Sequence, residues 1–273
     1  MQASPVWTAP TGTLGRIVAE ARERAHALLS HEAELARIAA DASNAPPFAS
    51  ALRSDTVQVI AEVKRRSPSK GWINAGISAV DQAKAYASGG AAAISVLTEP
   101  VHFGGSNDDL VQIREAVQVP VLKKDFHVQP VQLIEARALG ASAALLIARA
   151  LAPDELVRMI DTARQLRLEV LVEVRDDDEL QRALDAGARV IGINNRNLET
   201  LVIDPSTSER ILGRVPSSVI AIAESGVSER ADVERVAARG ADAVLVGSVV
   251  SAADDPSAMV AALCGVERVP RES

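Results

Sequence analysis

The sequence predicts an α/β protein of the (β/α)8 barrel (TIM barrel) class with an N-terminal helical extension. Eight short apolar runs alternate with helical segments, a Gly-Ala pair recurs once every two such units, and 273 residues suit this fold. Alternating strands and helices favour parallel pairing through right-handed crossovers. A doubly wound open sheet shares the alternation, but eight units fit a closed barrel better.

The first predicted element is a helix over residues 14–40. Its apolar residues recur at helical spacing on one stripe, and Pro46 and Pro47 then interrupt the pattern. We expect residues 1–50 to be an extension packed on the barrel, and residues 51–273 to be the catalytic barrel of a single-domain protein. The stripe consists of Leu14, Ile17, Val18, Ala21, Ala25 and Leu28.

Eight runs that follow are predicted to be strands because they are short and rich in β-branched residues. Pro130 and Pro153 mark the first turns of helices between them, and Ser228 is expected to be an N-cap. The predicted strands are Val57–Val63, Ala92–Leu97, Val119–Lys123, Ala143–Ile147, Glu169–Val174, Val190–Ile193, Val219–Ala223 and Ala243–Val246.

A Gly-Ala pair precedes every second strand and supports closure of the barrel. The pairs begin at Gly90, Gly140, Gly187 and Gly240, at intervals of 50, 47 and 53 residues. Glycine is expected there in the left-handed conformation that ends helices.

Composition limits the partners of the protein. A net charge of −7 and a pI near 5.2 argue against nucleic acid or an acidic membrane surface. No apolar stretch approaches the ~18 residues of a membrane span, and the first residues do not resemble an export signal. The single cysteine, Cys264, excludes an internal disulfide. We therefore expect a cytoplasmic protein that acts on a small molecule, as a monomer or a weak homodimer.

Polar residues occur where five of these strands end. Strand alternation places Glu62 and Lys64 on one side of their strand, opposite Val59, Ala61 and Val63. The same parity directs Lys124 into the barrel and Lys123 towards the helices.

These strand ends lie at the catalytic face of a (β/α)8 barrel. Ordinary strand-end salt bridges are the alternative interpretation, but partly buried charges are costly unless they are well paired. Six charges at one end favour a functional site. They are the cations Lys64, Lys124 and Arg196 and the carboxylates Glu62, Glu173 and Glu224.

Small residues follow the last two strands. Glu224-Ser225-Gly226 ends the seventh strand and Gly247-Ser248 ends the eighth. Backbone N–H groups in such loops can approach a phosphate, and barrels of this class often bind phosphate there.

Residue chemistry alone leaves the reaction open. A lysine among carboxylates can act as a general acid, or it can form a Schiff base when its pKa is lowered. The histidines and the cysteine do not have metal-ligand spacing, and no GxGxxG follows a strand, so neither a metal nor a dinucleotide is expected.

Seven blocks of sequence resemble indole-3-glycerol-phosphate synthases, in the order of that family. The resemblance covers about residues 48–260, and the combined blocks are highly specific. The blocks are IAEVKRRSPSKG (60–71), ISVLTEPVHFGGSNDDL (94–110), PVLKKDF (120–126), LVEVRDDDEL (171–180), IGINNRNLET (191–200), IAESGV (222–227) and LVGS (245–248).

The resemblance implies conversion of 1-(2-carboxyphenylamino)-1-deoxyribulose 5-phosphate to indole-3-glycerol phosphate, carbon dioxide and water, without a metal or organic cofactor. It implies that Lys124 protonates the ketone during ring closure. Glu173 and Glu62 match carboxylates that remove a proton and stabilise a cationic intermediate. Lys64 matches a lysine that contacts the substrate carboxylate and takes part in dehydration.

The remaining matched positions imply substrate contacts. Asn194, Arg196 and Glu224 match residues around the anthranilate carboxylate and the hydroxyl groups. Phe103 and Phe126 resemble aromatic pocket residues. The phosphate-binding positions correspond to Ser67, Ser225, Gly226, Gly247 and Ser248.

The sequence departs from the family pattern in four places. Val249-Val250-Ser251 after the last block is less typical, and the N-terminal helix lacks the family's commoner lysine-rich pattern. His127 stands where an aliphatic residue is more usual, and Arg149 where a small one is common.

Three other functions stay open: a Schiff-base aldolase, a barrel that binds sugar phosphates without turnover, and a sister isomerase. The combination AEVK…KDF…VEV favours the synthase.

Overall fold

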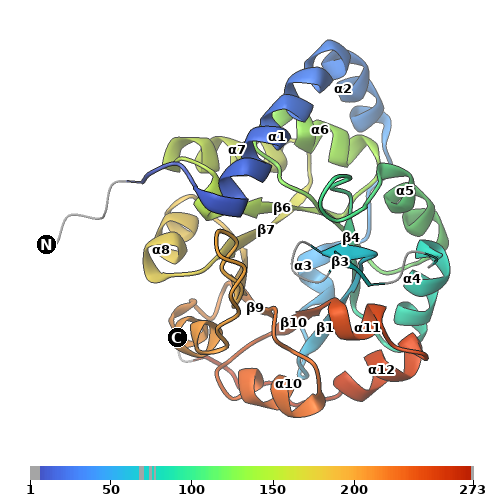
Figure 1. Cartoon of the computed structure of the whole chain (residues 1–273), viewed down its shortest axis with the longest axis vertical. Helices are drawn as coiled ribbons and strands as arrows, with labels where there is room; N and C mark the ends of the chain where they lie inside the picture. The colour runs from blue at the N-terminus through green and yellow to red at the C-terminus, as the bar shows by residue number, and fades with distance from the viewer. Residues whose placement is uncertain (1–6, 68–70, 74–75, 77, 272–273) are drawn as a thin grey trace, which may run out of the picture.

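Eight parallel strands form the centre of the fold. The computed structural model describes residues 7–67, 71–73, 76 and 78–271. The strands close into a barrel in chain order, which confirms the predicted fold class (Figure 1). They are β1 (Gln58–Val63), β4 (Ala93–Leu97), β5 (Val121–Lys124), β6 (Ala143–Ile147), β7 (Glu169–Val174), β8 (Val190–Asn194), β9 (Ile220–Glu224) and β10 (Ala243–Val246).

Closure is made by β1, which pairs with β4 on one side and with β10 on the other. Each predicted strand matches an observed one, and no end differs by more than two residues. The largest difference is at β5, which begins after Pro120 because proline has no N–H to donate to a neighbouring strand.

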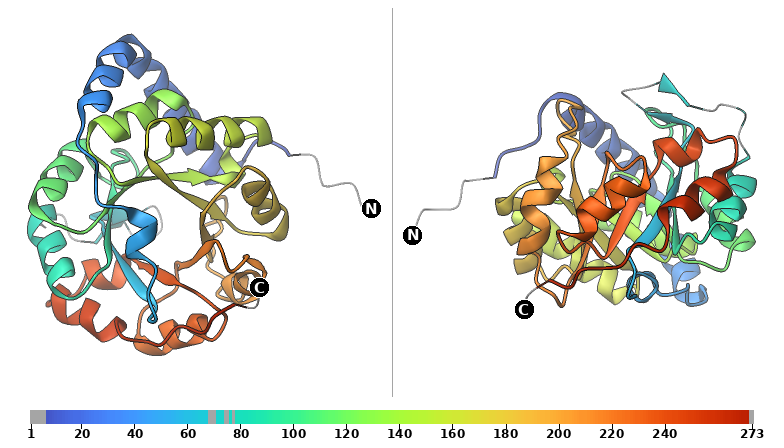
Figure 2. Two further views of the ribbon diagram at one scale, coloured as in Figure 1. Left: turned by 180° about the vertical axis from the view of Figure 1, so that it is seen from behind. Right: turned by 90° about the horizontal axis from the view of Figure 1, so that it is seen from below.

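Helices cover the outside of the barrel, and their buried faces supply much of its core (Figure 2). No described helix has both the length and the apolar character of a membrane span. The outer elements are α4 (Ala79–Ser88), α5 (Asn107–Ala116), α6 (Pro130–Ala138), η2 (Ala148–Ala150), α7 (Pro153–Gln165), α8 (Asp177–Asp185), α9 (Ser206–Ile211), η3 (Leu212–Arg214), α10 (Arg230–Ala237), α11 (Ser248–Ser251) and α12 (Pro256–Leu263).

The helix boundaries largely follow the predicted signals. Pro130 and Pro153 are the first residues of α6 and α7, as expected. The prediction of Ser228 as an N-cap is wrong: the cap position is Glu229, and Ser228 donates its hydroxyl to Asp232 at 2.9 Å. The four glycines of the Gly-Ala pairs all have positive φ, between 83° and 96°, which confirms their role at helix ends.

The N-terminal extension consists of α1 (Gly12–Leu28), η1 (Leu29–His31), α2 (Glu32–Asp41) and, after a linker, α3 (Phe48–Ala51). The first five residues of the predicted stripe are buried, whereas Leu28 is half-buried. A single helix over residues 14–40 is wrong, because a 3-10 turn separates α1 from α2. In that turn Ser30 donates its hydroxyl to the Ala27 carbonyl, and this kind of back-bonding bends helices.

The two ends of the barrel are covered differently. A short hairpin of β2 (Arg66–Ser67) and β3 (Gly71–Trp72) stands at the same end as α1 (Figure 2, right). At the opposite end α3 lies across the barrel, and its Ala49 N–H donates to Glu169 at the start of β7. The carboxyl ends of the strands therefore open between α1 and the hairpin.

Candidate functional site

A cavity of about 660 Å³ lies at the carboxyl ends of the barrel strands. Its lining contains every residue that the sequence predicted for the site, although these residues are spread over the whole chain. They are Glu62, Lys64, Ser67, Phe103, Lys124, Phe126, Glu173, Asn194, Arg196, Glu224, Ser225, Gly226, Gly247 and Ser248.

Strand geometry explains why the charged residues meet. Lys124, Asn194 and Glu224 are the last residues of their strands, and Glu62 and Glu173 are the last but one. Because carboxyl ends of parallel strands lie at one edge of the barrel, residues of the same parity converge there.

Strand alternation also places the side chains of Lys123 and Lys124 on opposite faces of β5. Lys123 Nζ lies among the helices, 3.1 Å from Glu135 of α6 and 3.7 Å from Asp125. Lys124 Nζ lies in the cavity, 3.5 Å from Glu62 Oε2 and 3.8 Å from Glu224 Oε2. The predicted orientations of both lysines are confirmed.

Glu62 bridges the two lysines of the cavity. Its Oε1 is 2.7 Å from Lys64 Nζ, and its Oε2 also accepts from Ser95 Oγ at 3.4 Å. Burial alone would raise the pKa of Glu62, but attraction to Lys64 and Lys124 outweighs it and lowers the pKa to about 2. Glu62 is therefore a fixed negative charge at neutral pH.

Lys124 is held in its charged form. Burial alone would lower its pKa, but attraction to Glu62, Glu224 and Glu173 raises it above the usual range of lysine. An ammonium group that is surrounded by three acidic side chains can donate a proton, but it is a poor nucleophile.

Glu173 and Glu224 differ from Glu62 in their protonation. Burial raises the pKa of Glu224 to about 8, and repulsion from Glu173 acts in the same direction. Burial also raises the pKa of Glu173, against attraction to Lys124 and a hydrogen bond from Asn194. The cavity thus holds one permanent carboxylate, Glu62, and two carboxyl groups whose pKa values are raised, that of Glu224 to about 8.

Asn194 is fixed between two groups of the cavity. Its Nδ2 donates to Glu173 Oε1 at 2.9 Å, and its Oδ1 accepts from the Arg196 backbone N–H at 2.9 Å. This pair of bonds defines the orientation of the amide and leaves the second oxygen of Glu173 available for a ligand.

The loops after β9 and β10 form one wall of the cavity. Ser225 and Gly226 both have positive φ, 63° and 88°, and Asn195 holds this turn by donating to the Ser225 carbonyl at 2.8 Å. A Cβ atom at Gly247 would lie 2.6 Å from Glu62 Oε1, so that only glycine allows this close approach. Ser248 begins α11 directly after it.

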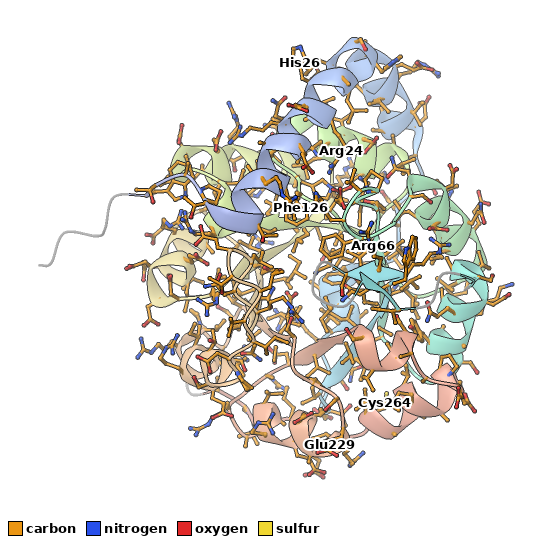
Figure 3. The ribbon with its side chains drawn as sticks, viewed as in Figure 1. Arg24, His26, Arg66, Phe126, Glu229 and Cys264 are labelled. Atoms are coloured by element: carbon orange, nitrogen blue, oxygen red, sulfur yellow. The ribbon has the colours of Figure 1, made fainter. Side chains whose placement is uncertain are left out.

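Two phenylalanines meet on the other side of the cavity. The ring centroids of Phe103 and Phe126 are 6.2 Å apart at a tilt of 36°, a favourable aromatic contact. Arg24 of α1 reaches towards this side and lies near Phe126 (Figure 3), with its NH2 2.8 Å from Asp125 Oδ1.

Part of the cavity lining was not predicted from the sequence. Thr13, Leu14 and Ile17 of α1 form a wall of the cavity, so the extension contributes to the site itself. The apolar stripe indicated that α1 is buried, but not that it covers the carboxyl ends of the strands. The loop after β8 adds Leu198 and Leu201, and no local signal marked them.

Among the residues that the structure describes, one group brings metal-ligand atoms together: Glu20, Glu99 and His102, within 4.8 Å of one another. Glu99 is paired with Arg24 at 3.2 Å and accepts from the backbone N–H of His102 at 2.6 Å. These partners already satisfy the carboxylate, and the guanidinium would repel a cation. We interpret the group as a link between α1 and the loop after β4.

Fold and site together define a (β/α)8-barrel enzyme whose acid–base residues lie at the carboxyl ends of its strands. A model of the family described as indole-3-glycerol phosphate synthase matches residues 14–263. The chain belongs to this family, whose members are carboxy-lyases of tryptophan biosynthesis.

Relatives in sequence support the family, and a solved structure supports the fold. Indole-3-glycerol phosphate synthase 2 of Streptomyces coelicolor is 46% identical, and the match covers 93% of this chain and 100% of that protein. The synthase of Mycobacterium avium is 50% identical, over 84% of this chain and 85% of that protein. The chain is similar in fold to 3-hexulose-6-phosphate synthase from Salmonella typhimurium, with a TM-score of 0.61 and 16% identity over 76% of this chain and 96% of that one. At this identity the likeness concerns the fold alone.

Proposed function

We propose that the cavity at the carboxyl ends of the strands converts 1-(2-carboxyphenylamino)-1-deoxyribulose 5-phosphate to indole-3-glycerol phosphate, with Lys124 as the acid of ring closure. One observation carries this assignment of roles: Lys124 Nζ lies in the cavity between Glu62 and Glu224, 3.5 and 3.8 Å from their carboxylates. The reaction is that of the family to which the chain belongs.

Ring closure needs a proton at the ketone oxygen. The aromatic carbon that bears the carboxylate attacks the ketone carbon, and the oxygen takes a proton from the Lys124 ammonium to become a hydroxyl group. The ring is then cationic, and the permanent charge of Glu62 stabilises it at short range. Loss of carbon dioxide leaves its bonding electrons in the ring and removes this charge.

Dehydration follows at the same carbon. The hydroxyl group leaves as water after protonation, for which Lys64 is placed beside Glu62 at 2.7 Å. A proton must also leave the neighbouring carbon, and Glu173 is the best acceptor because its raised pKa makes it a stronger base than Glu62. Asn194 orients this carboxylate by its hydrogen bond of 2.9 Å.

The other predicted residues bind the substrate in this proposal. Arg196 and Asn194 receive the anthranilate carboxylate, and Glu224 contacts a hydroxyl group of the substrate chain. Phe103 and Phe126 flank the aromatic ring. The phosphate lies against the loops after β9 and β10, where Ser225, Gly226, Gly247 and Ser248 line the cavity together with Ser67 of β2.

The Schiff-base alternative lacks support. A lysine that attacks a carbonyl must lose its proton first, and the acidic side chains around Lys124, above all the carboxylate of Glu62, raise its pKa instead of lowering it. Borohydride reduction in the presence of substrate is therefore expected to leave the protein unlabelled, and labelling of Lys124 would reverse this conclusion.

The direct test is incubation with the carboxyphenylamino-deoxyribulose phosphate while indole fluorescence is followed. The wild-type protein should produce indole fluorescence, and Lys124→Ala should lose turnover by about 1,000-fold or more while it still binds a substrate analogue. Lys84→Ala, which removes an exposed lysine of α4, is the matched control. Near-normal turnover by Lys124→Ala would show that another group supplies the proton.

We propose further that the protein works in the cytoplasm on this small sugar phosphate, as a monomer or a weak homodimer, without nucleic acid or membrane as a partner. Residues 1–50 and 51–273 are proposed to act as one unit, because Thr13, Leu14 and Ile17 line the cavity together with the barrel residues.

A further inference from the structure

Arg149, which departs from the family pattern, forms an ion pair that joins distant parts of the chain. It lies in η2, directly after β6, and its NH2 is 2.9 Å from Glu199 Oε1 in the loop after β8. Both side chains are about a quarter exposed, at 27% and 26%.

The N-terminal segment ahead of α1 is bound to both members of this pair. Arg149 NH1 donates to the Thr8 carbonyl at 2.5 Å, and Trp7 Nε1 donates to the Arg149 carbonyl at 3.3 Å. The Thr11 N–H donates to Glu199 Oε1 at 2.8 Å. Residues 7–11 are thus fastened to the barrel at the point where the wall formed by α1 begins.

Glu199 approaches the start of α1 through its backbone as well. Thr13 N–H donates to the Glu199 carbonyl at 3.3 Å, and a Cβ atom at Gly12 would lie 2.8 Å from that oxygen. Gly12 has a φ of 59°, so its conformation and its contact both favour glycine.

A continuous series of hydrogen bonds leads from Glu199 to the guanidinium of Arg196. Asn197 Oδ1 accepts from the Glu199 N–H at 2.9 Å, and the Asn197 carbonyl accepts from the Leu201 N–H at 2.6 Å. The Leu201 carbonyl in turn accepts from Arg196 NH1 at 3.1 Å. The conformation of this loop therefore fixes one of the hydrogen bonds that position the Arg196 guanidinium.

The ion pair also encloses a smaller cavity of about 140 Å³ next to the main one. Arg149 and Glu199 line it together with Glu173 and Arg196. Loss of the pair would open a side of this cavity close to the proposed base.

From these contacts we infer that Arg149 is a positioning residue for substrate binding: through Glu199 it holds residues 7–13 and the loop after β8 together, and this loop places Arg196. The inference rests on the proposed function, in which Arg196 receives the carboxylate of the substrate. Partly exposed ion pairs contribute little to stability, so we expect the effect of Arg149 in substrate binding and not in folding.

The chain offers a matched control. Arg22 also joins α1 to the barrel, through a bidentate pair with Glu155 of α7 at 3.2 and 3.3 Å, and its exposure is comparable at 40%. Neither Arg22 nor Glu155 is part of the lining of the two cavities.

The experiment compares steady-state kinetics of Arg149→Ala, Arg149→Lys, Glu199→Gln and Arg22→Ala on the carboxyphenylamino-deoxyribulose phosphate. Arg149→Ala should raise KM roughly tenfold with a smaller change in kcat, because binding is lost more than acid–base chemistry. Arg149→Lys should recover part of the loss. Combining Arg149→Ala with Glu199→Gln should add little to either change alone, since both remove the same link. Arg22→Ala should stay within about twofold of the wild type.

Amide hydrogen exchange supplies a readout that does not depend on turnover. Arg149→Ala should speed exchange of the Thr11 and Leu201 amides, whereas Arg22→Ala should leave both unchanged. Equal effects of Arg149→Ala and Arg22→Ala on KM, or unchanged exchange at Leu201, would overturn the inference. An inactive wild-type protein would instead contradict the proposed function. The exchange rate of the Leu201 amide would then still show whether Arg149 holds the loop after β8 in place.

Discussion

The carboxylate of Glu224 lies directly over Gly192 in the interior of the barrel. A Cβ atom at Gly192 would be 1.9 Å from Glu224 Oε1 and 3.1 Å from Leu171 Cδ1. That same Oε1 is buried and has no hydrogen-bond partner among the described residues. The space above Gly192 is therefore what permits an acidic side chain at this depth.

Gly192→Ala is expected to lower kcat/KM by about 100-fold, because Glu224 must move away from its place beside Lys124. The free energy of unfolding should fall by roughly 1–3 kcal/mol, since the end of a flexible side chain can shift to relieve the overlap. Turnover and thermal unfolding check both values. Gly213→Ala is the control, because a Cβ atom there meets nothing within 4 Å. Equal losses of activity in the two variants would contradict this explanation.

Glu173→Gln and Glu224→Gln should differ strongly although both remove a buried carboxyl group. Glutamine cannot accept a proton, so Glu173→Gln should lower kcat by about 100-fold or more. Glu224 has a pKa raised to about 8 by burial, so that at pH 7 it is mostly a neutral acid, which glutamine resembles. We expect Glu224→Gln to retain activity within about tenfold of the wild type at that pH.

The pH dependence distinguishes these roles further. Glu224 loses its proton as the pH rises through about 8, so kcat/KM of the wild type should fall above this pH, and the fall should be absent in Glu224→Gln. If kcat/KM falls at the same pH in the wild type and in Glu224→Gln, the loss of activity at alkaline pH is due to another group.

The position of the charged side chains at the strand ends follows from the sequence, because the alternation of side chains along a strand is a local property. Glu62, Lys124 and Glu173 could be assigned to the inside of the barrel from their immediate neighbours, and the structure places them there. Parity also separated Lys123 from Lys124, although the two are adjacent. Such predictions need only the strand register and the direction of the chain.

Contacts between distant segments were not predictable in this way. Arg149 and Glu199 are 50 residues apart, and neither belongs to a periodic pattern that indicates a partner. The amphipathic stripe of α1 predicts burial, but nothing in it specifies the mouth of the barrel as the surface that is covered. The room that Gly192 provides for Glu224 likewise depends on the pairing of β8 with β9.

Single replacements of Lys123 and of Lys124 by methionine should distinguish a lysine that stabilises the fold from one that takes part in catalysis. Lys123 is buried beside Glu135 and Asp125. Lys123→Met leaves Glu135 without its cation, whereas Asp125 keeps Arg24 at 2.8 Å, and should lower the free energy of unfolding by about 3 kcal/mol. Lys124→Met should lose turnover with a smaller loss of stability, because Glu62 keeps Lys64 at 2.7 Å. Urea unfolding and turnover measure both effects. A loss of kcat in folded Lys123→Met as large as in Lys124→Met would contradict the assignment.

His127, which also departs from the family pattern, should make the protein sensitive to acid. The ring is buried, its Nδ1 is 2.8 Å from the Leu145 carbonyl, and its Nε2 has no hydrogen-bond partner among the described residues. Burial lowers the pKa of His127 to about 4, and repulsion from Lys123 acts in the same direction. The unfolded chain, with a pKa near 6.5, therefore binds a proton more readily than the folded protein.

Because the unfolded state binds more protons between about pH 4 and 6.5, the stability of the folded protein falls as the pH decreases through this window. The full loss from this one group is roughly 3 kcal/mol below about pH 4. His127→Leu removes the titration, at a cost of about 1 kcal/mol at pH 7 for the lost hydrogen bond to Leu145. Urea unfolding of both proteins at several values from pH 7.5 to 4 tests this, since other groups cancel in the difference. The variant should be the less stable protein at pH 7 and the more stable one near pH 4, and parallel pH curves would show that His127 does not titrate as its burial demands.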